Sequence, residues 1–344
     1  MKYIGIIGGG GISETHARAS REIDDVEIAA FFGNNYERTA KLSEQYGGVV
    51  YRDLESFLSH QPLDLVIIGS PSGLHAEQGM AAARRGLHVL TEKPIDVSAA
   101  RAGELIKECE QAKVKLGVCF QDRVSPDIVR LKQLIDAGRA GKPILCSGYV
   151  KWFRPPEYYA NSRWRGTRAF DGGGALMNQG VHTVDLLLWL MGDVERVYAR
   201  TLTALHEIEV EDTVATLEFR NGAVGTIEVG TSIYPGYQRR VEVSGSEGTI
   251  VLEHDRIVRA DLRTADPTLV TQSVSNTNAS ASSPIVSDVS GHRRLIEDFI
   301  EAIETNGRPI CDGREGRRSV QLVEAIYESS RTSLPVRIES VPSA

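Results

Sequence analysis

The sequence lacks any long hydrophobic run. Its longest uninterrupted apolar stretch, Leu186 to Met191, is far shorter than the ~20 residues that span a bilayer. The apolar run after Lys2 passes within a few residues into glycines, which is not typical of a secretory signal peptide. We therefore expect a cytoplasmic protein that has no membrane partner.

Cysteine, histidine clusters and excess positive charge are also scarce. The four cysteines lie far apart without a C-x-x-C pair, which argues against a disulfide framework and against a zinc site. The eight histidines show no metal-ligand spacing, so no metal is expected. With 39 Lys+Arg against 46 Asp+Glu and a net charge of -7, a nucleic-acid partner is not expected either.

The chain is long enough for two domains. It has 344 residues, and domains contain about 150 residues on average. Residues 1–122 alternate short runs that are apolar throughout with amphipathic helical patterns. This alternation is typical of parallel strands that are covered on both faces. It predicts an α/β domain with a doubly wound parallel sheet.

Residues 123–344 follow a different pattern. After a loop rich in Arg, Pro and Tyr (residues 154–170) and a very apolar helix (Ala175 to Met191), strand-like runs follow one another between residues 194 and 252. Consecutive strands without helices between them predict a mostly antiparallel sheet and an α+β domain. The Ser-, Thr- and Asn-rich segment 271–290 is expected to be a surface loop, and two helices close the chain.

A glycine cluster follows the first predicted strand. In Gly8-Gly9-Gly10-Gly11-Ile12-Ser13, Gly8 and Gly10 fit the first two glycines of the pattern G-x-G-x-x-G/A. The first glycine allows a tight turn, and the second lets the backbone approach a pyrophosphate at a helix N-terminus. The cluster therefore predicts a dinucleotide site.

The end of the second predicted strand bears on the choice of dinucleotide. It ends in Gly33-Asn34-Asn35, without the carboxylate that holds the ribose 2′-OH in NAD-specific sites. Arg38, one turn further on, can pair with a 2′-phosphate, which favours NADP over NAD. The alternative is that Arg38 is a solvated helix residue and that the asparagines bond the ribose hydroxyls.

Two further features indicate chemistry. Lys93, in Thr91-Glu92-Lys93-Pro94, directly follows a predicted strand, at the edge of the sheet where ligands bind. Asn178, His182 and Asp185 fall on one face of the apolar helix at i, i+4 and i+7. A buried polar stripe is either a satisfied structural network or a functional site. For an isolated lysine after a strand, a surface position would be the favoured interpretation.

The glycine turn, Glu92-Lys93-Pro94 and the stretch from Gly172 to Asp185 together resemble the glucose–fructose oxidoreductase / inositol dehydrogenase / MocA (Gfo/Idh/MocA) family. The turn from Ser70 to His75 and the pair Glu211-Asp212 add to this resemblance, which covers nearly the whole chain. It implies a Rossmann domain, a second domain with a large and mostly antiparallel sheet, and a homo-oligomer (a dimer or tetramer).

The resemblance also implies hydride transfer between NAD(P) and a carbon of a sugar, cyclitol or sugar derivative. Lys93 matches the family's catalytic lysine and His182 its catalytic histidine. Asn178 stands where many members carry Asp; an amide orients a hydroxyl but takes no proton, so Asn178 would position the substrate. Asp185 either orients His182 or belongs to a structural network.

The expected sites are the following. The cofactor-binding residues are Gly8, Gly10, Gly11, Ile12, Asn34, Asn35, Arg38, Ser70, Pro71, His75, Glu92, Lys93 and Gln121. The catalytic residues are Lys93, His182 and Asn178, and the further substrate-binding residues are Tyr158, Arg163, Trp164 and Arg165. Aromatic residues with arginines suit a sugar or an anionic group, but they suit an oligomer interface equally.

Three other functions fit the same residues. One is a nucleotide-sugar or sugar-acid 3-dehydrogenase. Another is a glycosidase that works by transient oxidation with bound NAD. The third is a regulator that senses NAD(P) without turnover, although a sensor has no need of both Lys93 and His182.

Overall fold

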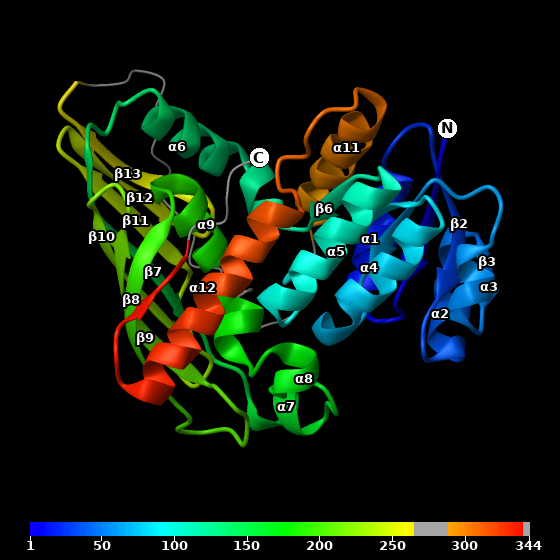
Figure 1. Ribbon diagram of the computed structural model, residues 1–344, viewed down its shortest axis with the longest axis horizontal. Coiled ribbons are helices and arrows are strands. Elements are labelled where there is room, and N and C mark those ends of the chain that lie inside the picture. Colours follow the sequence, from blue (N-terminus) through cyan, green and yellow to red (C-terminus); the bar gives the residue numbers. More distant parts are fainter. Residues whose placement is uncertain (265–287, 340–344) are drawn as a thin grey trace. The chain divides into compact units, whose positions relative to one another are not determined.

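The computed structural model describes residues 1–264 and 288–339 of the chain (Figure 1). These residues form two compact units: 1–121 with 288–317, and 122–264 with 318–339. Most of the Ser-, Thr- and Asn-rich segment, residues 271–287, lies outside the described residues.

The compact units differ from the predicted division, 1–122 and 123–344, at residues 288–317, which group with the first unit. The reason is the apolar face of helix α11 (Ser290–Glu304), which buries Leu295, Ile296 and Phe299 and packs on α1. The Phe299 ring also fills the space left by the missing side chain of Gly117, where a Cβ atom would lie 2.8 Å from it. Burial of these three side chains ties the helix to the N-terminal sheet.

The first unit is built on a six-stranded parallel sheet in the order β3-β2-β1-β4-β5-β6. The predicted doubly wound parallel sheet is therefore confirmed, and its strand order is that of the Rossmann fold. The inner strands are apolar on both faces, and the adjacent residues Leu65 and Val66 of β4, which point to opposite faces, are both fully buried. The strands are β1 (Lys2–Ile7), β2 (Val26–Phe32), β3 (Val49–Tyr51), β4 (Leu65–Ile68), β5 (His88–Thr91) and β6 (Leu116–Val118).

Helices connect these strands. They are α1 (Gly11–Arg21), α2 (Tyr36–Tyr46), α3 (Leu54–Leu58), η1 (Ser72–Leu74), α4 (His75–Arg84), α5 (Ala99–Ala112) and α11. The short helix η2 (Gln121–Val124) and the long helix α12 (Gly313–Thr332) each begin in the first unit and end in the second.

The second unit is built on an eight-stranded sheet in the order β13-β12-β11-β7-β10-β9-β8-β14. Only β7 and β10 pair in parallel, so the predicted, mostly antiparallel sheet is confirmed. The sequence missed the edge strands β13 and β14. The strands are β7 (Pro143–Lys151), β8 (Val194–Leu202), β9 (Asp212–Phe219), β10 (Val224–Gly230), β11 (Arg240–Gly245), β12 (Gly248–Glu253), β13 (Arg256–Leu262) and β14 (Val336–Arg337).

The helices of the second unit carry the predicted polar stripe. The apolar helix expected over residues 175–191 begins instead with a π-helical turn, η3 (Leu176–Gly180), and continues as α9 (Val181–Met191). Thr183 and Leu187 of α9 pack against Gly148 of β7. The predicted loop 154–170 contains two short helices. The remaining helices are α6 (Pro126–Asp136), α7 (Pro156–Ala160) and α8 (Arg168–Asp171).

The search for membrane-spanning segments covered the described residues. Within 1–264 and 288–339, no helix combines the length and the apolar character that crossing a bilayer requires.

Candidate active site

The glycine turn between β1 and α1 has the geometry that a dinucleotide requires. Gly8 has a φ of +131°, and a Cβ atom there would lie 2.6 Å from the carbonyl oxygen of Gly69, so only glycine fits. A Cβ atom on Gly10 or Gly11 would meet no described atom within 4 Å, and both residues are exposed. Helix α1 thus begins at an open glycine edge, where its N–H groups can receive a pyrophosphate. These residues fit the cofactor; Ile12, the next residue, is half-buried.

The residues after β2 are exposed. Asn34, Asn35 and Arg38 lie on the surface at the start of α2. The side chain of Asn35 caps this helix, because its Oδ1 accepts a hydrogen bond of 3.0 Å from the backbone N–H of Arg38. The Asn35 oxygen therefore serves the helix, which leaves Asn34 and Arg38 as the exposed groups for a ribose or a 2′-phosphate.

The turn after β4 is held by His75. Its ring is buried, with Nδ1 2.8 Å from the carbonyl oxygen of Pro94 and Nε2 2.9 Å from that of Ser70. The Ser70 hydroxyl donates to Gln78 at 2.6 Å, and Pro71 is half-buried. The predicted cofactor residue His75 thus connects two turns of the protein with its ring.

The turn after β5 carries Lys93. Its side chain is half-buried, whereas the preceding Glu92 is buried. One carboxylate oxygen of Glu92, Oε2, accepts a hydrogen bond of 3.1 Å from the backbone N–H of Lys93. Gln121, after β6, is half-buried. Because parallel neighbours end at one edge of a sheet, the candidate residues after β1, β4, β5 and β6 share that edge.

The candidate residues of the second unit are Asn178 and His182. Between Ala175 and Leu188 these two are the only side chains that are not buried. They are four positions apart, so they lie on the same face of the helical segment. An amide and a neighbouring imidazole are therefore the polar groups that this buried segment presents.

His182 faces an acidic residue that the sequence analysis missed. Its Nδ1 lies 3.3 Å from Oδ2 of Asp122, which is buried and also ion-paired with Arg239. Burial by itself would raise the pKa of Asp122, but the charges of Arg239 and His182 outweigh it and hold this pKa well below its usual range. Asp122 is thus a buried, ionised partner for the imidazole. No motif marks Asp122 or Arg239, because neither is near His182 in the sequence.

Asn178 is also tied to a buried carboxylate. Its Nδ2 donates to Oδ1 of Asp171 at 2.5 Å, and Oδ2 of Asp171 accepts from the backbone N–H of Gly166 at 2.7 Å. Asp171 therefore connects the π-helical turn to the loop that carries the predicted aromatic and arginine residues. The amide of Asn178 therefore has a buried carboxylate as its direct neighbour.

The loop residues form a cation–π cluster. The guanidinium of Arg165 lies 4.2 Å from the ring centroid of Tyr158 and 5.4 Å from that of Trp164. Tyr158 Oη accepts a hydrogen bond of 3.2 Å from Gln179, which is next to Asn178. The structure thus brings Tyr158, Trp164 and Arg165 together, and Tyr158 connects them to the residue next to Asn178. Arg163, in contrast, is exposed.

Asp185, the third residue of the polar stripe, belongs to a buried ion pair. Its carboxylate accepts two hydrogen bonds from Arg123, of 2.8 and 2.7 Å, and one of 3.2 Å from Ser319. Arg123 and Asp185 are each 1% exposed in their side chains. Of the two roles left open for Asp185, this geometry favours the structural network.

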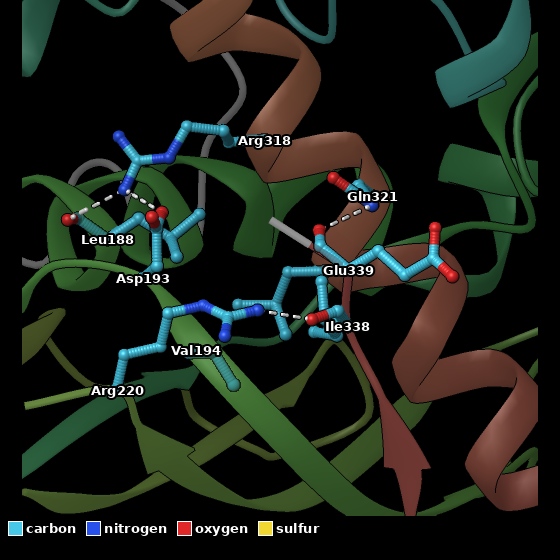
Figure 2. A pocket seen from close by; sticks show the side chains of 9 residues that line it. Leu188, Asp193, Val194, Arg220, Arg318, Gln321, Ile338 and Glu339 are labelled. Carbon is cyan, nitrogen blue, oxygen red and sulfur yellow. Dashed lines mark hydrogen bonds and ion pairs between the residues drawn. The ribbon is translucent and has the colours of Figure 1, made fainter. Parts of the chain in front are cut away.

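A pocket of the second unit lies beside the C-terminal segment (Figure 2). Its arginines are engaged in holding the chain: Arg220 donates to the carbonyl oxygen of Ile338 at 2.6 Å, and Arg318 pairs with Asp193 at 2.7 Å. The described residues that line it include none of the predicted site residues. We do not assign it to the active site.

Comparisons with known proteins define the class of the protein. Residues 2–120 match the family described as an oxidoreductase family with an NAD-binding Rossmann fold, and residues 128–251 match the GFO/IDH/MocA C-terminal domain. The chain is therefore an oxidoreductase of the NAD-binding Rossmann class, as predicted. It belongs to the Gfo/Idh/MocA family.

Individual relatives agree with this assignment. The chain is similar to the WlbA dehydrogenase of Bordetella pertussis, solved in complex with NADH and UDP-GlcNAcA, with a TM-score of 0.89 and 31% identity over 99% of this chain and 98% of that chain. It is 31% identical to the rhizopine catabolism protein MocA of Rhizobium meliloti over 71% of this chain and 76% of that protein. It is 28% identical to a D-xylose 1-dehydrogenase (NADP(+)) of Haloferax volcanii over 97% of this chain and 99% of that protein.

Proposed function

We propose that the protein transfers hydride between NAD(P) and a secondary alcohol or ketone of a sugar, cyclitol or sugar derivative. One observation carries the proposal. In the segment from Ala175 to Leu188 only Asn178 and His182 are not buried, and His182 Nδ1 faces the ionised carboxylate of Asp122. Polar side chains in an otherwise buried segment cost free energy unless they are hydrogen-bonded or face a ligand. The relatives of the chain include xylose, inositol and levoglucosan dehydrogenases, which supports the substrate class.

His182 is the proposed general base. With Nδ1 facing Asp122, Nε2 is the nitrogen that takes the hydroxyl proton during oxidation and returns it during reduction. The imidazolium that forms is stabilised by the Asp122 carboxylate, whose own position is fixed by Arg239. The nitrogen assignment follows from this pairing.

Lys93 and Asn178 have the complementary roles. Lys93 donates a hydrogen bond to the reacting oxygen and stabilises its developing negative charge. Asn178, fixed by Asp171, orients a substrate hydroxyl but takes no proton. NAD(P), when bound, accepts or supplies the hydride. Gly8, Gly10 and Gly11 and the N-terminus of α1 would hold its pyrophosphate.

Substrate binding is assigned to the loop cluster. Tyr158 and Trp164 offer aromatic faces to a sugar ring, and Arg165, with the exposed Arg163, offers charge-assisted hydrogen bonds. The arginines favour a second candidate, a nucleotide-sugar or sugar-acid 3-dehydrogenase. A substrate with a carboxylate or phosphate would pair with the charge of these arginines, whereas a neutral cyclitol has no charge to pair with it.

We infer that the cofactor preference is for NADP. The end of β2 has no carboxylate to repel a 2′-phosphate, and Arg38 is exposed in the first turn of α2. Arg38→Ala should raise KM for NADP about 10-fold or more and leave KM for NAD within about two-fold. Lys41→Ala, an exposed cation on the same helix, is the matched control. Equal use of both cofactors by the wild type would contradict the inference.

The first test is a substrate panel. Purified protein is given sugars, cyclitols, uronates and UDP-sugars with NAD or NADP, and NAD(P)H absorbance is followed at about 340 nm. Turnover with one substrate identifies the substrate class, and turnover confined to UDP-sugars or uronates favours the second candidate. Tight cofactor binding without any absorbance change would contradict the proposal. That result would favour the glycosidase or the NAD(P) sensor.

Variants then test the roles of the second-unit residues. His182→Ala should lower kcat by about 10²- to 10⁴-fold. Asp122→Asn should lower kcat by about 10- to 100-fold and alter its pH profile, because the amide cannot stabilise the imidazolium. Asp255→Asn is the matched control, since Asp255 also pairs with Arg239. If Asp122→Asn and Asp255→Asn behaved alike, Asp122 would have no role specific to His182.

We further propose a cytoplasmic homo-oligomer of two or four copies. The face of the eight-stranded sheet exposes apolar side chains on neighbouring strands, among them Leu145, Tyr198, Val214 and Val224. Such a face is suited to association with a second copy. Light scattering coupled to size exclusion measures the mass, and a monomer at micromolar concentration would contradict the proposal.

A further inference from the structure

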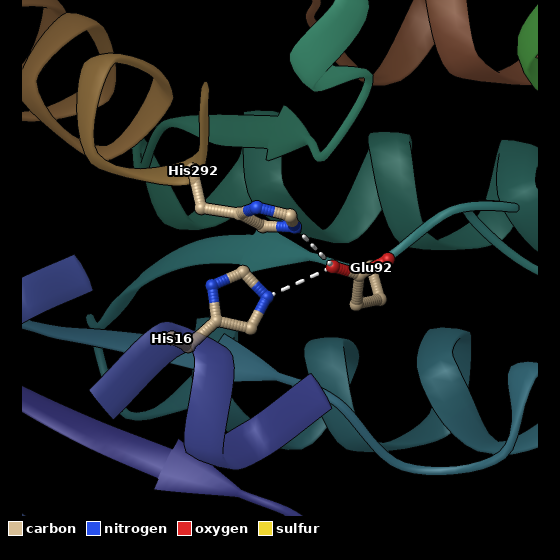
Figure 3. Close-up of side chains that lie close together, drawn as sticks. All are labelled: His16, Glu92 and His292. Atoms are coloured by element: carbon tan, nitrogen blue, oxygen red, sulfur yellow. Dashed lines mark hydrogen bonds and ion pairs between the residues drawn. The ribbon is translucent and has the colours of Figure 1, made fainter. Parts of the chain in front are cut away.

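A buried cluster of three ionisable side chains lies behind the Lys93 turn (Figure 3). It joins His16 of α1, Glu92 after β5 and His292 of α11. Oε1 of Glu92 is 2.9 Å from Nε2 of His16 and 3.8 Å from Nε2 of His292. The side chains are 0%, 7% and 4% exposed in the order His16, Glu92, His292. Charged groups at this depth need partners, and these partners come from three distant parts of the chain.

The Glu92 carboxylate connects this cluster to Lys93. While Oε1 faces the two histidines, Oε2 accepts the hydrogen bond of 3.1 Å from the backbone N–H of Lys93. The other side of the turn is fixed by His75, whose Nδ1 lies 2.8 Å from the carbonyl oxygen of Pro94. The backbone at Lys93 is therefore held from both sides, and one of the two holds depends on His16 and His292.

Hydrogen bonding explains the cluster better than a bound metal. The three ligand atoms lie within 4.8 Å of one another, a set that a divalent cation can use. However, the 2.9 Å between His16 and Glu92 is an ordinary hydrogen-bond length. Nδ1 of His16 is buried without a hydrogen-bond partner among the described residues. A metal-ligating histidine almost always donates from its second nitrogen.

We propose that His16 and His292 are positioning residues for Lys93, which they hold in place through the Glu92 carboxylate. The inference rests on the proposed function, in which Lys93 acts on the reacting oxygen. His16 lies in α1, directly after the glycine turn, so the same hydrogen bond connects the cofactor-binding helix to the Lys93 turn. His292 adds the contact from α11, the helix that groups with the first unit although it lies far along the chain.

The charge state of Glu92 gives the cluster a measurable signature. Burial by itself would raise the pKa of Glu92, but the hydrogen bond from His16 and the charges of His16, His292 and Lys93 outweigh it and lower this pKa to about 2. Burial and, to a lesser extent, the nearby Glu92 charge also raise the pKa of the Cys119 thiol. A variant without His16 should retain the buried carboxylate but protonate it at a higher pH.

The experiment compares His16→Leu, which removes the hydrogen bond, with His16→Gln, which keeps an N–H donor. His16→Leu should lower kcat about 10- to 100-fold, with KM for the substrate within about two-fold, and should shift the acid limb of kcat to higher pH. His16→Gln should recover most of kcat. His292→Leu and His292→Gln form a second pair, which keeps the test decisive if a His16 variant fails to fold.

His60→Leu is the matched control. His60 is hydrogen-bonded elsewhere in the same unit, with its Nδ1 2.8 Å from Tyr51 Oη. It should lower the melting temperature without changing the pH profile. If the leucine and glutamine variants lost activity equally, and only in proportion to the loss of folded protein, the histidines would have a structural role alone. That result would overturn the proposal.

A readout independent of turnover separates this proposal from the proposed function. Amide hydrogen exchange of the peptide that contains Lys93 should be faster in His16→Leu than in the wild type or His16→Gln. Faster exchange in a protein without NAD(P)-dependent turnover would refute the function and leave the positioning intact. Unchanged exchange would overturn the positioning. Stoichiometric zinc or manganese in the purified wild type, lost in His292→Leu, would also overturn it in favour of a metal site.

Discussion

Replacement of Asp185 by asparagine tests whether this residue supports the fold or orients His182. Asp185 follows His182 by three residues, so the sequence left both roles open. In the structure its carboxylate accepts hydrogen bonds of 2.8 and 2.7 Å from Arg123, and the two side chains are 1% exposed. The Arg123 guanidinium also lies 5.2 Å from the ring centroid of Trp189. We expect a structural role, with the proposed general base His182 held by Asp122 instead.

The magnitude follows from the burial of Arg123. Removal of one partner from a buried ion pair costs about 3–5 kcal/mol, because the other charge stays in a medium of low polarity. Asparagine has nearly the volume of aspartate and keeps one acceptor, so we expect the lower value of about 3 kcal/mol. For a unit of this size, that loss lowers the melting temperature by about 6–12 °C.

The assay is urea unfolding of the full chain together with kcat per folded molecule. Asp185→Asn should lose about 3 kcal/mol and keep kcat within about three-fold. The double variant Arg123→Met/Asp185→Leu, which removes both charges, should recover most of the stability. Glu218→Ala breaks the exposed pair with Arg196 and should leave the free energy of unfolding nearly unchanged. A loss below about 1 kcal/mol in Asp185→Asn, with kcat lowered 10-fold, would refute the reasoning.

Three further predictions concern the first unit and the thiols. Gly8→Ala should weaken cofactor binding about 10-fold or more in a fluorescence titration, because its Cβ would clash with Gly69 and the φ of +131° disfavours alanine. Burial raises the pKa of the Cys109 and Cys146 thiols to about 12, so native protein should react with a disulfide reagent only slowly at pH 8, and fully after unfolding. The lowered pKa of Glu92 should stabilise the fold by about 3 kcal/mol above about pH 4.5, and this contribution is lost as the pH falls toward 2. The free energy of unfolding should therefore fall less between pH 6 and pH 3 in Glu92→Gln than in the wild type.

The doubly wound sheet was predictable from the sequence because its signals are local. Strands such as Leu65–Ile68 are apolar throughout, and the helices between them have one apolar face. The glycine turn was equally local: a backbone with positive φ at Gly8 needs glycine, whatever the rest of the chain does. The alternating strands of the second unit were visible for the same reason, since a strand with one exposed face shows a period of two.

The parts that the sequence analysis missed depend on contacts between distant residues. Helix α11 has an amphipathic pattern that any sheet could bury, and only the folded chain shows that its partner is α1. The edge strand β14 has two residues, Val336 and Arg337, too few for a periodic signal. The π-helical turn at Leu176–Gly180 interrupts a stretch whose composition predicts one continuous helix. The packing partner of α11, the strand β14 and the π-helical turn therefore have no local signature in the sequence.

The same distinction applies within the candidate site. Lys93 and His182 belong to local motifs, whereas the distant residues behind them do not. His16 and His292 face Glu92, the residue before Lys93, and Asp122, 60 residues before His182 in the chain, faces His182. A side chain that exchanges protons must be partly open to the substrate, so a buried neighbour has to fix its orientation. That neighbour is supplied by whichever element the topology brings there. A motif match alone therefore predicts which residues carry the chemistry, and variants of Asp122 and His292 test what orients them.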